Sequence, residues 1–448
     1  MVGRKKLEQL SQKAIKKAVE MGATQVEVVL WSGAEELTRF ANNEIHQSVS
    51  LEDMTIHVRA IVNNKIGVAR GNSNISDIVK KAVQLAKIAP EDKHFKSLPS
   101  PKRYKDFSHV YRKSHHLGAA GRAEKIKDIF YQLPTTNYQL STSGAFSESE
   151  GEVLIANSLG VLAYSETKSA NLNVIVTGKS GSGYATGSAK GGQEIDTASV
   201  VTAAIEKATS YGEPITVEAG DYEVILEPAA VAELLDFFAW YGPNARIYHE
   251  DVSFLQNNLG KKVFDEKLTI YDDTHHPDIF PNGFDMEGHP KNILPIIEKG
   301  MAKNIAYDSY HAHKHGGRNT GHALLAPNVW GPIPTHLRIA SGEWRVEDMI
   351  KKIKKGILVT RFWYTRVVHY KELMLTGMTR DGTFLIENGK ITARVNNLRY
   401  TDSVIRVMGK IRGIGKDLKL EGSEGSAHLV PVLHLKSFRF TTATTEEK

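Results

Sequence analysis

Cysteine is absent from this 448-residue sequence. Its absence excludes disulfide bonds, thiolate metal ligands and a cysteine nucleophile. Long apolar runs are also missing: none reaches the ~18 residues that a membrane helix needs, so no membrane partner is expected. The basic start of the chain has no apolar segment of the signal-peptide kind. Together these absences favour the cytoplasm.

Positive charge is only slightly in excess of negative charge. The formal net charge is +6 and the pI is about 9.0. The cations are dispersed, and the dense run Lys351–Lys355 is predicted to be the solvated face of a helix. Because a nucleic-acid binder usually concentrates positive charge on one face, nucleic acid is the weakest of the candidate partners.

The first half of the chain has the pattern of helices flanking an antiparallel sheet. Apolar residues at helical spacing predict helices, and β-branched runs separated by Asn-Asn pairs predict strands and turns. The expected helices cover residues 4–21, 75–88, 119–133 and 195–210, and the expected strands cover 26–31, 36–40, 45–51, 55–62, 137–145, 150–157 and 161–177. The Gly- and Ser-rich segment 178–192 lacks the Gly-Lys-Ser/Thr ending of a phosphate loop and is predicted to be a flexible connection.

The second half is richer in strands. Glycine and proline mark a boundary near residues 211–220, and residues 445–448 are expected to be a frayed tail. Beyond the boundary we expect a proline-started helix at 229–240 and strands at 221–226, 268–273, 293–299, 383–388, 390–395 and 431–440. Because the chain is too long for one ordinary core, we expect an α+β fold in two domains. Residues 1–215 would form an N-terminal helix and antiparallel-sheet domain, and residues 216–448 a β-rich C-terminal domain.

An ordered set of short segments resembles the TldD/PmbA family over nearly the whole chain. No one segment is decisive, but their order along the chain is specific. The segments are Phe40–Ile45, Ala156–Val161, Gly220–Pro228, Ser253–Leu255, Leu259–Phe264, Leu268–Asp273, Phe284–Gly288, Tyr307–Tyr310, Asn319–His322 and Phe384–Gly389. The resemblance implies that the chain has two domains and that the protein works as a dimer.

The same resemblance implies that a zinc centre is missing here. In the TldD branch, the helix after strand 221–226 carries HExxxH, and a cysteine near the C-terminus adds a thiolate ligand. Counting along this chain places those positions at about Asp236, Phe237, Tyr241 and Ser423. An aromatic side chain cannot replace an imidazole on zinc. The chain therefore resembles the metal-free PmbA (TldE) branch, so no cofactor is expected except zinc in a partner subunit.

That branch implies a function as the metal-free subunit of a cytoplasmic peptidase assembly that processes small or unfolded peptides. The partner would be a second copy or a TldD-like metalloprotease. Whether this chain has enzymatic activity of its own stays open.

Two clusters are candidate sites in their own right. Arg361, Tyr364, Arg366, Arg380 and Asp381 are predicted to line a peptide cleft, because arginine beside aromatic rings can hold a carboxylate or stack on a peptide. An internal ion-pair network is the alternative. In an alternating strand, Arg361 would face one side, and Tyr364 and Arg366 the other.

The second cluster is His311, His313 and His315. If this segment is a strand, its alternate residues share a face and three imidazoles converge on one metal ion, which would support a self-sufficient metallopeptidase or other hydrolase. A polar histidine-rich loop is the alternative. Asp272, Asp273, Asp285 and Glu287 could supply paired carboxylates, although turn and strand-end roles are favoured. No GxSxG nucleophile elbow is present.

Overall fold

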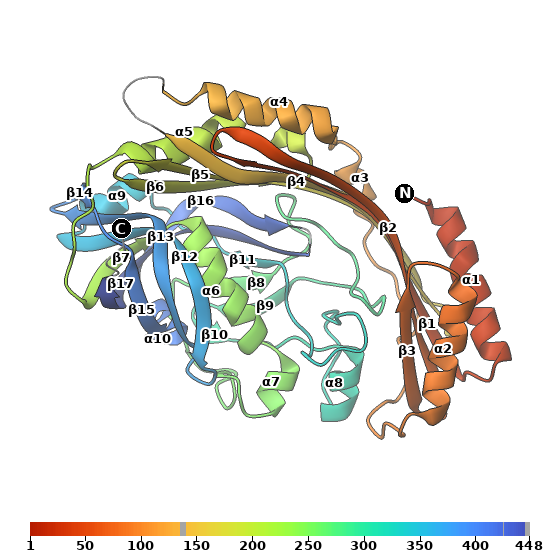
Figure 1. The fold of residues 1–448 in the computed structure, drawn as a ribbon. Helices are drawn as coiled ribbons and strands as arrows, with labels where there is room; N and C mark the ends of the chain where they lie inside the picture. Colours follow the sequence, from red (N-terminus) through yellow and green to blue (C-terminus); the bar gives the residue numbers. More distant parts are fainter. Residues whose placement is uncertain (135–139, 424, 444–448) are drawn as a thin grey trace.

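A long, curved antiparallel sheet forms an arch over a β-rich domain in the computed structural model, which describes residues 1–134, 140–423 and 425–443 (Figure 1). The sheet has six strands in the order β3-β2-β1-β4-β5-β6. Its strands are β1 (Gln25–Ala41), β2 (Glu44–Val62), β3 (Lys65–Gly71), β4 (Ser141–Asn157), β5 (Leu162–Gly178) and β6 (Gly181–Ala189). The predicted α+β fold, with an N-terminal sheet region before a β-rich region, is confirmed.

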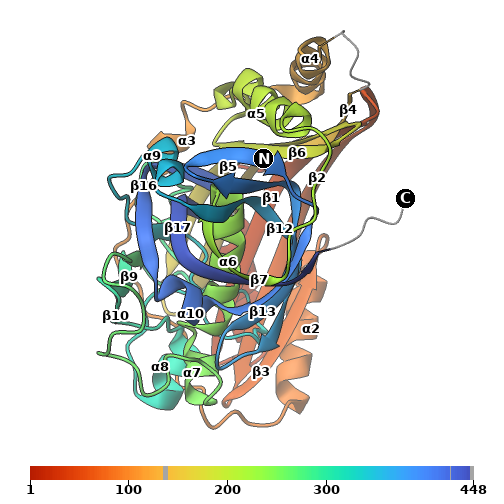
Figure 2. The same ribbon diagram turned by 90° about the vertical axis from the view of Figure 1, so that its left-hand side faces the viewer.

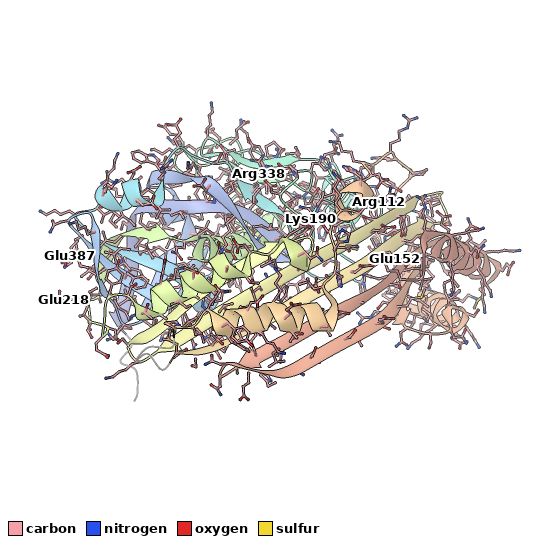
Figure 3. The ribbon with its side chains drawn as sticks, turned by 90° about the horizontal axis from the view of Figure 1, so that it is seen from above. Arg112, Glu152, Lys190, Glu218, Arg338 and Glu387 are labelled. Atoms are coloured by element: carbon pink, nitrogen blue, oxygen red, sulfur yellow. The ribbon has the colours of Figure 1, made fainter. Side chains whose placement is uncertain are left out.

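Helices cover the outer face of the arch (Figure 1). Two pack at one end of the sheet, and α4 and α5 lie side by side across the other end when seen from above (Figure 3). The helices of this half are α1 (Arg4–Glu20), α2 (Ile75–Ile88), α3 (Ser108–Tyr111), α4 (Gly118–Tyr131) and α5 (Thr197–Thr209), with a 3₁₀ turn at Gly192–Glu194. The concave face is left to contact the second half of the chain.

The local patterns of this half predicted its helices and turns well. Helix α2 has the predicted bounds, and the turn residues Asn42, Asn43, Asn63 and Asn64 all have positive φ. The four strands expected between residues 26 and 62 are instead two continuous strands, β1 and β2, which pair with each other along their length. Three residues of the strand expected at 137–145 and the expected tail at 445–448 lie outside the described residues.

The prediction of a flexible connection at 178–192 is wrong, because residues 181–189 form β6. Small residues serve close packing here. A Cβ added to Gly183 would lie 2.2 Å from the Ala204 carbonyl oxygen of α5. The glycines therefore let α5 approach the backbone of β6 closely. From composition alone, the same glycines suggest a flexible loop.

The second half is built on a closed ring of strands (Figure 2). β17 pairs with both β15 and β7, which closes the order β17-β15-β13-β12-β7, and β11, β8, β9 and β10 extend the sheet from β17. The strands are β7 (Gly220–Leu226), β8 (Ile270–Asp272), β9 (Leu294–Glu298), β10 (Met301–Ala302), β11 (Leu337–Ile339), β12 (Lys355–His369), β13 (Met374–Glu387), β14 (Lys390–Arg394), β15 (Leu398–Ser403), β16 (Ile411–Ser423) and β17 (Ser426–Ala443).

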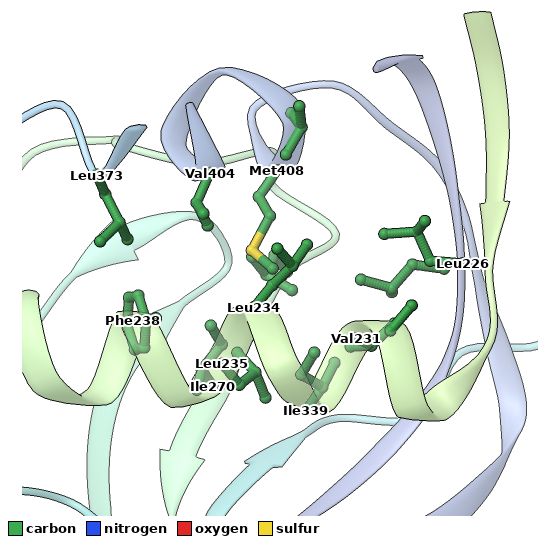
Figure 4. Close-up of a cluster of buried hydrophobic side chains, with 14 of the residues drawn as sticks. Leu226, Val231, Leu234, Leu235, Phe238, Ile270, Ile339, Leu373, Val404 and Met408 are labelled. Carbon is green, nitrogen blue, oxygen red and sulfur yellow. The ribbon is translucent and has the colours of Figure 1, made fainter. Parts of the chain in front are cut away.

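Helix α6 packs against this ring and carries its core (Figure 4). Pro228 starts the helix at a position where no backbone N–H is required. Ala230, Val231, Leu234, Leu235 and Phe238 follow at helical spacing and are 0–1% exposed. The helices of this half are α6 (Pro228–Tyr241), α7 (Ala245–His249), α8 (Ser309–His315), α9 (Val346–Lys351) and α10 (Val404–Met408). The helix expected through Lys355 ends at Lys351, because β12 begins at Lys355.

The two sheets share no strand within the described residues. We propose that residues 1–215 and 216–448 are the two domains. None of the helices in the described ranges combines the length and apolar character needed to cross a membrane.

Candidate functional site

The exposed face of α6 carries an aspartate tied to a buried histidine. Asp236 Oδ1 accepts a hydrogen bond from His428 Nε2 at 2.8 Å. His428 Nδ1 accepts from the Leu337 backbone N–H at 3.2 Å, so Nε2 is the nitrogen that carries the proton. The Asp236 side chain is 51% exposed while that of His428 is 2% exposed. The pair therefore joins α6 to β17 and leaves one carboxylate oxygen available on the surface of the helix.

The hairpin between β16 and β17 lies against the same residue. Ser426 Oγ donates to Asp236 Oδ1 at 3.4 Å, and Ser423 is paired with Ser426 across the hairpin. The structure thus brings the positions counted for the metal motif and for the cysteine to one place. The described side chains there include the Asp236 carboxylate, two serine hydroxyls and the His428 imidazole, and the chain has no thiol.

Glu233 lies one turn before Asp236 on α6. Burial raises the pKa of its carboxyl group, and the Asp236 charge raises it further, while a hydrogen bond from Thr365 lowers it. Thr365 is on β12 and also contacts the hydroxyl of Tyr400 at 2.8 Å. Sequence reasoning missed Glu233, although a charged residue in an otherwise apolar helix was a usable signal.

The structure brings Arg361, Arg380 and Asp381 together in contacts with one another. Arg361 Nε donates to Asp381 Oδ2 at 2.9 Å, with a second bond from Nη2, and Arg380 Nε lies 3.8 Å from the same oxygen. Ser182 Oγ of β6 donates to Asp381 Oδ1 at 2.5 Å. The Arg361 guanidinium lies 4.2 Å from the centre of the Tyr184 ring. This part of the cluster is thus an ion-pair network within the second half of the chain, and a hydrogen bond and a cation–π contact join it to β6.

Tyr364 and Arg366 lie apart from that network. Tyr364 is 65% exposed, and the Arg366 guanidinium lies 5.7 Å from the centre of its ring. The expected strict alternation, with Phe362 on the same face as Tyr364, is wrong because Phe362 is buried in the core. The register of β12 against β13 shifts between Trp363 and Arg366, and Tyr364 has a positive φ, so the bulge turns the later side chains outward.

The outer half of β12 has an open edge. β7 pairs with β12 only over Gly356–Val359, whereas β13 follows β12 to His369 on the other side. Within the described residues no strand pairs with the β7 side of β12 beyond Val359. The hydrogen bond from Thr365 to Glu233 places this strand beside α6.

Neither the strand nor the histidine-rich loop considered for His311, His313 and His315 is formed, because residues 309–315 form α8. On a helix, His311 and His315 share a side and His313 does not, so three alternate imidazoles cannot converge. His311 Nδ1 is instead held by Asp308 Oδ1 at 2.8 Å. The His315 ring stacks on His249 of α7 at 3.8 Å, and burial together with the neighbouring His249 lowers the pKa of His315 to about 4.

One other cluster has metal-ligand residue types. Glu36, His116 and Glu148 place a ligand atom each within 4.8 Å of one another. Arg122, which is 0% exposed, already donates to both carboxylates. A cation therefore occupies the space between the two carboxylates, and the cluster fits a structural ion pair better than a metal site.

The four acidic residues expected at turns and strand ends are buried. Asp272 accepts from His322 Nε2 at 3.1 Å, and Asp285 accepts three backbone N–H groups. Burial, with the neighbouring Glu287, raises the pKa of Asp285 to about 7. Asp273 pairs with Arg338. Asp272, Asp273 and Asp285 are thus each engaged by partners inside the protein.

A small cavity that sequence reasoning missed lies between the two halves of the chain. Its volume is about 120 Å³, and it reaches from the arch to the hairpin beside Asp236. Its lining includes Trp31, Phe284, Lys291, His322, Thr335 and Gly425. These residues come from four separate parts of the sequence, so no local pattern marks the cavity.

Comparison with known families identifies the scaffold. Family models described as PmbA/TldA metallopeptidase domain 1, central domain and C-terminal domain match residues 26–88, 118–210 and 219–441. The chain belongs to the PmbA/TldD family. The resemblance found in the short segments is thereby confirmed.

Relatives within the PmbA/TldD family include named metalloproteases. A metalloprotease TldD homolog of Buchnera aphidicola is 30% identical over 46% of this chain and 43% of its own length. The metalloprotease PmbA of Escherichia coli is 29% identical over 37% of this chain and 35% of its own length. The chain therefore matches less than half of the length of these two relatives.

A solved PmbA/TldD-family structure has the same fold. TldE from Thermococcus kodakarensis superposes with a TM-score of 0.87 at 19% identity, over 96% of this chain and 100% of that chain. At this identity the likeness establishes the fold. In this PmbA/TldD protein, HExxxH occurs nowhere in the sequence, and the positions expected by counting, near Asp236, Phe237 and Tyr241, lie on α6 or at its end.

Proposed function

We propose that this chain is the metal-free subunit of a cytoplasmic PmbA/TldD-type peptidase assembly that processes small or unfolded peptides. The observation that carries the proposal is the face of α6. It keeps the helix of the metallopeptidase scaffold but presents Asp236, hydrogen-bonded to His428, beside two hydroxyl groups. A second imidazole and a thiol, which the HExxxH-type zinc centre uses, are both missing from the described side chains there.

An exposed aromatic surface supports a partner subunit. Trp240, Trp330, Tyr370 and Val329 are 38–68% exposed. The Trp240 and Trp330 rings contact each other at 5.5 Å, and Tyr241 contacts Tyr370 at 5.0 Å. Exposed apolar side chains that gather in one place mark interaction surfaces. Because this surface borders α6, a metal-bearing partner bound there would bring its own centre close to this chain.

The open edge of β12 supports a role in holding peptides. An extended peptide can add to an unpaired strand edge through backbone hydrogen bonds, so its sequence matters little. Tyr364 and Arg366 border this edge and could stack on the peptide. In the assembly this chain would form a wall of the channel, while the partner hydrolyses the bond.

Co-expression with a TldD-like metalloprotease from the same source tests the proposal. We expect one assembly by native mass spectrometry, with zinc only in the partner and peptide hydrolysis only by the assembly. Trp330→Ser should weaken assembly, whereas Tyr131→Ser, at an 82% exposed aromatic of α4, should not.

Two results would contradict the proposal. Peptide hydrolysis by the pure chain with bound zinc would indicate a self-sufficient enzyme. Tight DNA binding that weakens steeply with salt, without any partner, would indicate a nucleic-acid function.

A further inference from the structure

A polar cleft separates the end of the arch from the β13–β14 region of the second domain. Its volume is about 440 Å³. The first domain contributes the turn between β5 and β6, including Lys179 and Ser182, and the segment at Glu213. The second domain contributes Arg380, Asp381 and Arg394.

Arg394 is a buried cation without a carboxylate partner. It is 3% exposed, and no ion pair involves it within the described chain. Nη1 donates to the Ser182 carbonyl at 3.1 Å, and Nη2 donates to the carbonyls of Ser210, at 3.2 Å, and Lys207. Nε is buried and has no hydrogen-bond partner among the described residues. Burial lowers the pKa of this arginine, and its charge is stabilised by carbonyl dipoles and by the Phe384 ring, whose centre lies 5.3 Å from the guanidinium.

Further cations surround the cleft. The Arg380 side chain is 45% exposed, and Lys179 lies on the opposite wall. The two nearby carboxylates are already engaged, because Asp381 bonds to Arg361 and Ser182, and Glu213 accepts from Ser180. Among the lining residues, the three cations Lys179, Arg380 and Arg394 therefore face the two carboxylates, which leaves one positive charge in excess.

We propose that this cleft binds a small oxyanion, either the terminal carboxylate of a peptide or a free phosphate. Arg380 and Lys179 would donate to the anion directly, and the buried Arg394 would stabilise it through its charge. Guanidinium and ammonium groups form their strongest hydrogen bonds with such oxygens. Gly181 has a positive φ, and a Cβ added to it would lie 2.9 Å from Arg394 Nη1. Glycine at this position therefore lets the β5–β6 turn lie close to Arg394. This site does not depend on the proposed function, because it requires neither a partner nor peptide hydrolysis.

Isothermal titration of the full chain tests the site with three probes: inorganic phosphate, a short peptide with a free carboxylate, and the same peptide amidated. We expect saturable binding of phosphate, of the free-carboxylate peptide, or of both, and none of the amidated peptide. Phosphate alone would identify the source as a free phosphate, and the carboxylate peptide alone would identify a peptide terminus.

Variants at exposed positions keep the test clear of folding defects. Lys179→Gln and Arg380→Gln should each weaken binding by about tenfold, because each removes one charge-assisted hydrogen bond. Lys390→Gln removes an exposed cation from β14, the strand that carries Arg394, and should leave binding within about twofold. The proposal is wrong if neither phosphate nor the carboxylate peptide binds. It is also wrong if the amidated peptide binds as tightly as the free one, or if the Lys390 variant loses as much affinity as the cleft variants.

Discussion

Two of the contacts between the two halves of the chain have opposite charge balance. At one end of the arch, Arg59 of β2 is 7% exposed and bonds to Glu27 at 2.7 Å and to Glu287 of the second domain at 3.2 Å. Nearby, His57 Nε2 bonds to the Ala326 carbonyl. At the other end, the cleft around Arg394 has cations in excess and about 440 Å³ of open space.

The difference indicates separate roles for the two contacts. A buried arginine between two carboxylates, one from each half of the chain, has its charge neutralised and holds the two halves in register. A buried arginine whose hydrogen bonds go to carbonyl groups, beside an opening, leaves charge for a ligand to satisfy. Buried cations at one domain interface can thus be structural or functional, and the carboxylates around each decide which.

The largest expected effect comes from breaking the closed contact, which is the buried contact of Arg59 with Glu27 and Glu287. Arg59→Met leaves Glu27 and Glu287 buried without their cation, so the free energy of unfolding should fall by about 3–5 kcal/mol. Urea denaturation measures it. A loss no greater than that of Lys390→Gln would show that the contact does not hold the domains together.

A smaller effect is expected from Arg361→Ala at the open cleft. Asp381 is 6% exposed and would keep only its hydrogen bond from Ser182 and the longer contact to Arg380, so unfolding should become easier by about 1–3 kcal/mol. Thermal and urea unfolding of wild-type and variant check this. Unchanged stability with weaker peptide binding would instead favour the original cleft interpretation of Arg361.

The closed contact should also respond to pH. Burial lowers the pKa of His57 to about 4 in the folded chain, below its ordinary value of 6.5. Between these values the unfolded chain binds more protons, so His57 costs the folded state about 1 kcal/mol on going from pH 7 to pH 5.5. His57→Gln should remove that part of the pH dependence. Equal slopes for the two proteins in this window would contradict the assignment.

The smallest change in stability is expected at Arg366. Its only described partner is the exposed ring of Tyr364, so Arg366→Ala should change the free energy of unfolding by less than about 0.5 kcal/mol. If β12 holds peptides, an assembly that contains this variant should nevertheless bind a fluorescent peptide more weakly than the wild-type assembly does. Unaltered peptide binding would remove Arg366 from the proposed channel wall.

Local patterns predicted the parts of the fold that local forces determine. Helix α2, the Asn42–Asn43 turn and the strand before α6 follow from spacing and backbone preference. The alternating histidines of α8 suggested a strand, because alternate residues of a strand share a face. The segment is a helix instead, and Asp308 caps it by accepting a hydrogen bond from the His311 backbone N–H.

The candidate site was only partly predictable, for a different reason. Arg361 and Asp381 are close in sequence, and their pairing was within reach of strand reasoning. Ser182 and Asp381 are 199 residues apart, and Arg59 and Glu287 are 228 apart, so only tertiary packing brings them together. Cavities between domains are formed by such contacts and leave no signal in a local window.

The pairing of β7 with β17 has a consequence for synthesis of the chain. Leu226 pairs with Leu433, a partner made 207 residues later. At about 5–20 residues per second, a ribosome needs roughly 10–40 seconds to span that distance. For that time β7 has no β17 to pair with and α6 no complete ring to pack against. We therefore expect nascent chains stalled before β17 to be captured by chaperones far more than chains released after it.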